Sequence, residues 1–132
     1  MNNILIDTNI FIDHLRGFQP STDFLLRVFQ GEYHAQISTL TEMELFAGTI
    51  PTEAEKEKVK ALLEKFTPVP VSSVIARKAG TLLRLYRNMG LVPVDALIAA
   101  TSMEREAILV TKDVKHFGVI EGLLTLHPYY TE

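Results

Sequence analysis

The chain contains 132 residues, of which 47% are hydrophobic, enough for one core built from several helices and strands. No apolar run approaches the roughly 18 residues that a membrane-spanning helix needs, and the absence of cysteine excludes disulfides and thiolate metal ligands. The net charge of −3 argues at first against a nucleic-acid partner, but this objection weakens if several acids share one metal ion. We therefore expect a single domain over residues 1–132, located in the cytoplasm.

The first stretch of the chain combines a buried strand with a carboxylate. Residues 4–6 form an unbroken apolar run, which is typical of a strand covered on both faces of a parallel sheet. The run stops at Asp7, Thr8 and Asn9, and the apolar residues that follow have helical spacing. Asp7 is therefore expected where a central strand ends, which is where open α/β sheets bind ligands. The alternative is that Asp7 or Thr8 only caps the next helix.

The middle of the chain alternates between helices and strands. Apolar periodicity predicts a helix over 20–31 capped by Ser21 or Thr22, a strand over 33–37, a helix from 38, a helix over 52–66, a short peripheral strand over 68–71 and a helix over 73–88. This order favours an α/β domain with a parallel sheet.

The helix that follows the second predicted strand carries another acid, Glu44. Thr39 and Glu42 have the spacing of a capping box, so Glu42 is explained by capping. Glu44 then lies on the first turns of this helix, on a different side from Glu42. Taken alone, a solvated glutamate would explain it.

Two further acids lie at similar junctions. Asp95 is in the first turn of a helix predicted to continue to Arg105, where the helix dipole alone would favour an acid. Residues 108–110 form another apolar triplet, and Thr111 and Asp113 follow it, which repeats the opening pattern. Residues 123–126 are expected to form a last edge strand.

The four carboxylates Asp7, Glu44, Asp95 and Asp113 together are harder to explain as caps, because a cap can equally be Ser, Thr or Asn. Acids crowded in one cleft raise one another's pKa unless a cation neutralises them. Mg²⁺ and Mn²⁺ are the hard cations that suit oxygen ligands, and such a site suits phosphodiester hydrolysis.

These motifs resemble the PIN-domain ribonucleases, in particular the VapC-type toxins of toxin–antitoxin pairs. The resemblance rests on Asp7-Thr8-Asn9, on Ser38-Thr39-Leu40-Thr41 leading to Glu44, on the helix that starts at Asp95, and on residues 109–113 with His116-Phe117. It implies a three-layer α/β/α sandwich around a central parallel sheet, endoribonuclease activity that depends on Mg²⁺ or Mn²⁺, dimerisation, and inhibition by an antitoxin protein.

Carried over by position, the resemblance assigns Asp7, Glu44 and Asp95 as catalytic metal ligands, with Asp113 at a more variable fourth position. It assigns supporting roles to Thr8, Asn9 and Thr111. Candidate RNA contacts are Arg77, Arg84 and Lys112. The histidines match no triad or zinc spacing and are interpreted as structural or exposed: His14, His34, His116 and His127.

Two other functions remain open. A phosphotransfer enzyme or phosphatase on a similar sheet could use Asp7 as the phosphoryl acceptor, although a second aspartate two positions later is replaced by Asn9. A non-catalytic PIN-like binding module would be expected to lose acids, and all four are present.

A homodimer and an apolar groove for an antitoxin helix are also expected. This expectation rests on the number of aromatic side chains, whose combined surface is more than one small core readily buries. The residues are Phe11, Phe24, Phe29, Phe46, Tyr129 and Tyr130.

Overall fold

The computed structural model describes residues 2–48 and 52–129. Its centre is a parallel sheet of five strands in the order β3-β2-β1-β4-β5. The strands are β1 (Asn2–Ile6), β2 (Tyr33–Ser38), β3 (Thr67–Val69), β4 (Ile108–Val110) and β5 (Thr125–Leu126). The apolar triplet before Asp7 lies in the central strand β1, as predicted. The triplet at 108–110 forms the neighbouring strand β4, and the short segments at 67–69 and 125–126 form the edges.

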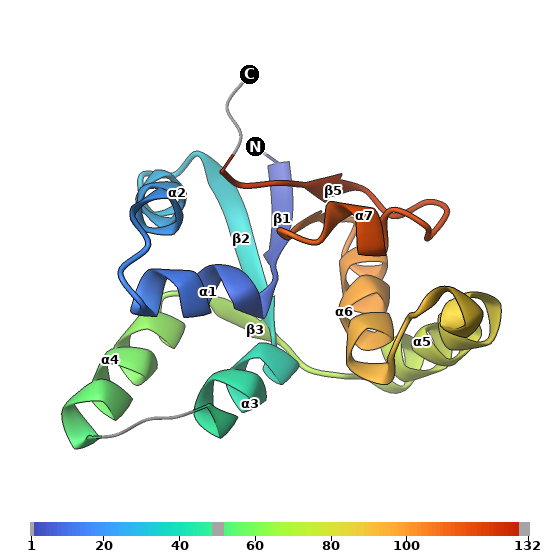
Figure 1. Ribbon diagram of the computed structural model, residues 1–132, viewed down its shortest axis with the longest axis horizontal. Helices are drawn as coiled ribbons and strands as arrows, with labels where there is room; N and C mark the ends of the chain where they lie inside the picture. The colour runs from blue at the N-terminus through green and yellow to red at the C-terminus, as the bar shows by residue number, and fades with distance from the viewer. Residues whose placement is uncertain (1, 49–51, 130–132) are drawn as a thin grey trace.

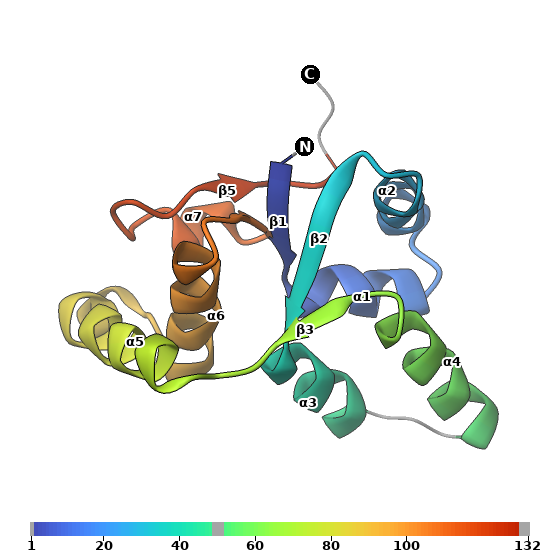
Figure 2. The ribbon, with the colours of Figure 1, turned by 180° about the vertical axis from the view of Figure 1, so that it is seen from behind.

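Helices cover both faces of this sheet (Figure 1). One face carries α1 (Thr8–Leu15), α2 (Gln19–Phe29), α3 (Thr39–Ala47) and α4 (Glu53–Leu63). The other face carries α5 (Ser73–Tyr86), which continues into the 3-10 turn η1 (Arg87–Met89), α6 (Pro93–Glu104) and α7 (Val114–Phe117). Figure 2 shows the same arrangement from behind, with β3 beside β2. The predicted three-layer α/β/α sandwich is confirmed.

The apolar triplet of β1 explains why both faces are covered. Successive side chains of a strand point to opposite faces, and Ile4 and Ile6 enter the core beneath α1–α4, while Leu5 enters the core beneath α5 and α6. All three are fully buried. No helix in the described ranges is both long and apolar enough to cross a bilayer.

The start of α2 differs from the prediction. The helix begins at Gln19 with Phe18 at its N-cap, so neither Ser21 nor Thr22 caps it. Ser21 lies inside the helix, where its Oγ donates to the Phe18 carbonyl at 2.7 Å. Pro20 in the first turn explains the earlier start, because proline needs no hydrogen bond there.

The cap of α3 also differs. Ser38, rather than Thr39, is the N-cap, and its Oγ accepts a hydrogen bond from the Leu40 amide at 3.0 Å. The predicted Thr39–Glu42 capping box is therefore wrong by one position. At the start of α4, Thr52 is the N-cap, and its Oγ1 accepts from the Glu55 amide at 3.1 Å.

The aromatic residues fall into two groups. Phe11 and Phe24 are buried, so they supply none of the apolar surface expected of them, whereas Phe29 and Phe46 are 44% and 41% exposed. Tyr129 packs edge-on against Phe18 with ring centroids 5.2 Å apart. Tyr130 lies outside the described residues.

Replacing Ser38 by alanine should lower the free energy of unfolding by about 1 kcal/mol, because the Leu40 amide loses its cap. Thr39→Ala should change it by no more than about 0.5 kcal/mol. Urea titrations of both variants measure the difference, and the reverse ranking would restore Thr39 as the cap.

Candidate functional site

Asp7 lies where three backbone segments meet. Its amide donates to the Val110 carbonyl at the end of β4 at 2.9 Å, which continues the β1–β4 ladder into the site. Its carboxylate Oδ1 accepts from the Thr8 amide at 2.8 Å, so Asp7 is the N-cap of α1. Oδ2 accepts from Thr111 Oγ1 at 2.9 Å. The capping interpretation of Asp7 is thus geometrically correct, but it leaves the burial of this carboxylate unexplained.

The pKa of Asp7 is raised to about 6, chiefly because the carboxylate is buried. The negative charges of Glu44 and Asp113 raise it further. The hydrogen bonds from Thr111 and the Thr8 amide act in the opposite direction and do not compensate. None of the described cationic side chains forms an ion pair with Asp7.

Glu44 approaches Asp7 through Thr8. Thr8 Oγ1 donates to Glu44 Oε1 at 2.6 Å, and Thr41 Oγ1 lies 2.9 Å from Thr8 Oγ1. Because the single hydroxyl proton of Thr8 goes to the carboxylate, Thr41 must donate to Thr8. Thr41 and Glu44 are three positions apart on α3 and share a face. The hydroxyls therefore orient Glu44 toward the start of α1.

Asp113 approaches Asp7 from the other side, through Thr111. Thr111 Oγ1 donates to Asp7 and accepts from the Asp113 amide at 3.0 Å. Asp113 is the N-cap residue of α7, with its side chain largely exposed. Thr8 and Thr111 thus bond to acids of the candidate site, and the supporting roles of Thr8, Thr111 and Asn9 stay predictions.

Asp95 is in the first turn of α6, as predicted. Its Oδ2 lies 2.7 Å from Nε2 of His116, a residue of α7. The segment that begins with Asp113 therefore also holds the Asp95 carboxylate.

The structure thus links Asp7, Glu44 and Asp113 through two threonines, and links Asp95 to them through α7. Within residues 2–48 and 52–129, no three Asp, Glu or His side chains are grouped as ligands of one ion. Glu44 and Asp95 are instead bonded to Thr8 and His116. Convergence of these acids on one metal ion stays a prediction. The donor set still fits Mg²⁺ or Mn²⁺ chemically, because it consists of carboxylate oxygens around a buried Asp7 whose charge no described cation neutralises.

Sequence reasoning missed Thr41 and His116. Thr41 could have been found from its three-residue spacing to Glu44 on a predicted helix. His116 is likewise three positions after Asp113, but α7 has only four residues and its helical period is too short to read.

The predicted RNA contacts have different surroundings. Arg77 and Arg84 are exposed on α5, seven positions apart. Lys112 Nζ forms an ion pair with Asp13 Oδ2 at 2.8 Å, and Tyr129 OH donates to the same oxygen at 2.8 Å.

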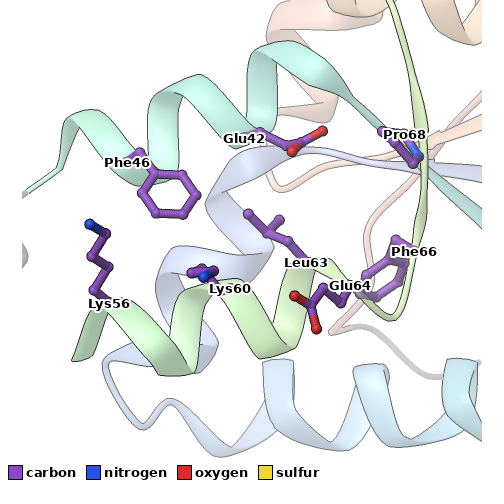
Figure 3. A pocket seen from close by; sticks show the side chains of 8 residues that line it. All are labelled: Glu42, Phe46, Lys56, Lys60, Leu63, Glu64, Phe66 and Pro68. Carbon is purple, nitrogen blue, oxygen red and sulfur yellow. The ribbon is translucent and has the colours of Figure 1, made fainter. Parts of the chain in front are cut away.

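A hollow of about 520 Å³ lies between α3 and α4 (Figure 3), and none of the four acids lines it. Its lining combines the apolar residues Phe46, Leu63, Phe66 and Pro68 with the charged residues Glu42, Lys56, Lys60 and Glu64.

The raised pKa of Asp7 predicts a pH-dependent stability. The folded protein holds a proton on Asp7 that the unfolded chain has released between pH 3.8 and about 6, so this residue's contribution to the free energy of unfolding falls as pH rises through that window. The fall amounts to about 3 kcal/mol. Without divalent cations, Asp7→Asn should lack it and be at least as stable as wild type at pH 7.

Denaturant titrations at pH 4.5 and pH 7 measure about 2 kcal/mol of this fall, because the rest of it lies below pH 4.5. Asp23→Asn is the matched control, because Asp23 is exposed on α2. An equal pH dependence in wild type and Asp7→Asn would contradict the assignment.

Known proteins resemble this chain in sequence and in fold. A family model for the PIN domain matches residues 4–121. The ribonuclease VapC10 of Mycobacterium tuberculosis is 37% identical over 124 residues, covering 91% of this chain and 90% of the relative. Ribonuclease VapC19 of the same species is 36% identical over 121 residues, covering 90% and 95%. A toxin–antitoxin complex from Klebsiella pneumoniae contains a chain 27% identical, with a TM-score of 0.78 and coverage of 97% and 99%. The chain therefore belongs to the PIN-domain family, among the VapC ribonucleases.

Proposed function

We propose that this chain is a metal-dependent endoribonuclease that uses Mg²⁺ or Mn²⁺ and acts in the cytoplasm as the toxin of a toxin–antitoxin pair. The observation that carries the proposal is Asp7, a buried carboxylate with a pKa raised to about 6 and the charges of Glu44 and Asp113 nearby. Such a perturbed acid at the carboxyl end of a central strand is typical of a functional site.

The residues of the site have distinct tasks in this proposal. A divalent cation bound there would activate a water and stabilise the charge that develops on the phosphate. Asp7, Glu44 and Asp95 would hold this cation, with Asp113 at its edge. Thr8 and Thr111 fix the carboxylates of Glu44 and Asp7 by donating hydrogen bonds at 2.6 and 2.9 Å. The exposed Arg77 and Arg84 are candidate contacts to RNA phosphates, and Lys112 would have to leave Asp13 to join them.

An antitoxin and a second copy of the chain are the proposed protein partners. The Klebsiella pneumoniae protein whose chain resembles this one was solved as a toxin–antitoxin complex. Apolar surface suited to a partner helix is available on α3, where Met43 and Phe46 are exposed, and the adjoining hollow of Figure 3 is lined by Leu63 and Phe66. Exposed Val74 and Leu85 on α5 provide a second apolar surface.

Asp7→Asn should reduce RNA cleavage by at least about 100-fold with saturating Mg²⁺ or Mn²⁺, because a carboxylate ligand is lost. Asparagine caps helices about as well as aspartate, so a pure cap would leave the activity intact. Cleavage of a mixed RNA population, followed on denaturing gels, measures the change.

Asp23→Asn should cut RNA at the wild-type rate, since Asp23 is exposed on α2, where it accepts a hydrogen bond from Gln19. An Asp7→Asn protein as active as this control would overturn the role of Asp7. A wild-type protein that cuts no RNA with either cation would favour a binding module, and acid-stable phosphate on Asp7 would favour the phosphotransfer alternative.

The proposed dimer should be detected by light scattering at micromolar concentration as twice the chain mass of 14.8 kDa. Burial of the exposed apolar side chains would drive this association. A monomer at that concentration would contradict it.

A further inference from the structure

The contact between His116 and Asp95 has a defined chemistry. An ionised carboxylate only accepts hydrogen bonds, so the 2.7 Å contact requires His116 to donate from Nε2. Across the described ranges, His116 is the one side chain that donates to Asp95, and it does so at Oδ2. The second carboxylate oxygen, Oδ1, is therefore left for another ligand.

The imidazole is itself held in place. Its ring lies edge-on to that of the neighbouring Phe117 with centroids 5.3 Å apart, and Phe117 is buried in the core beneath α5 and α6. The Phe117 amide donates to the Asp113 carbonyl at 3.1 Å. This hydrogen bond connects the last residue of α7 to its N-cap, Asp113. His116 thus extends from a segment anchored at both ends, and this segment also carries Asp113.

Asp95 needs such a partner more than Asp7 does. The Asp7 carboxylate is fixed by the Thr8 amide of α1 and by the Thr111 hydroxyl. The Asp95 side chain, in contrast, is 28% exposed and receives no hydrogen bond from the amides of α6. Without His116, this carboxylate could rotate among its staggered conformations. Partners that orient metal ligands in this way typically change metal affinity by 10- to 100-fold when removed.

We propose that His116 is a positioning residue, which holds Asp95 through Oδ2 so that Oδ1 can bind the divalent cation. The proposal rests on the function proposed above. In this proposal α7 also connects two acids of the site, because His116 contacts Asp95 and Asp113 is the N-cap of the same short helix.

The test exploits which ring nitrogen makes the contact. The amide nitrogen of glutamine can take the place of Nε2, whereas that of asparagine corresponds to Nδ1 and falls short of Asp95. Mn²⁺ affinity, measured by calorimetry without RNA, should fall at least about tenfold in His116→Leu and His116→Asn. In His116→Gln it should stay within about threefold of wild type.

His34→Leu is the matched control. His34 is exposed near the start of β2, at the opposite end of the sheet, and its Nδ1 also bonds a side-chain oxygen, that of Asn3 at 3.0 Å. Its Mn²⁺ affinity should equal that of wild type. Thermal unfolding without Mn²⁺ establishes that each variant is folded. The comparison of His116→Gln with His116→Asn remains valid even if His116→Leu disturbs the structure of α7.

The outcomes separate this proposal from the proposed function. If wild type and His116→Leu bind Mn²⁺ equally well, His116 is structural and only the present proposal falls. If His116→Gln binds Mn²⁺ as weakly as His116→Leu does, hydrogen-bond donation from the Nε2 position does not determine the Mn²⁺ affinity, and the proposal falls as well. If wild type binds no Mn²⁺ and cuts no RNA, both are overturned. If His116→Gln alone retains the affinity, the positioning role is established.

Discussion

The burial of the Asp7 carboxylate is the constraint around which the site is built. Burying a charge is costly unless it is paired or well hydrogen-bonded. Among the residues that the structure describes, only the Thr8 amide and the Thr111 hydroxyl bond to it, and the pKa remains raised to about 6. A residue needed only as a helix cap could be a neutral asparagine or serine. The buried carboxylate at this position is therefore the basis of our proposal that Asp7 binds a cation.

Hydroxyl groups, rather than cationic side chains, connect Asp7 with Glu44 and Asp113. Thr8 bonds to Glu44 through its hydroxyl and to Asp7 through its amide, and Thr111 similarly bridges Asp7 and the Asp113 backbone. A lysine or arginine in these places would fix the same geometry but would neutralise the charge. Threonine fixes the carboxylates and leaves their negative charge available. This choice explains how the site can be ordered and still attract a divalent ion.

Most of the fold and the location of the site were predictable because they depend on local patterns. The apolar triplets before Asp7 and Thr111 identified β1 and β4, and parallel strands bring their carboxyl ends to one edge of the sheet. The α3 cap was misplaced because Ser38 and Thr39 are adjacent and chemically equivalent as caps. The His116–Asp95 contact spans 21 positions and depends on how α7 packs, which no sequence period encodes.

The ion pair between Lys112 and Asp13 preserves the negative charge of the site. Lys112 stands between Thr111 and Asp113 in the chain, where a lysine could neutralise the acids. Asp13 at the end of α1 holds its Nζ at 2.8 Å instead. Despite partial burial, the pKa of Asp13 is lowered by Lys112 and by the hydroxyl of Tyr129, so Asp13 stays ionised at neutral pH. Tyr129 therefore helps to keep Asp13 ionised and paired with Lys112, and RNA would have to compete with Asp13 to engage this cation.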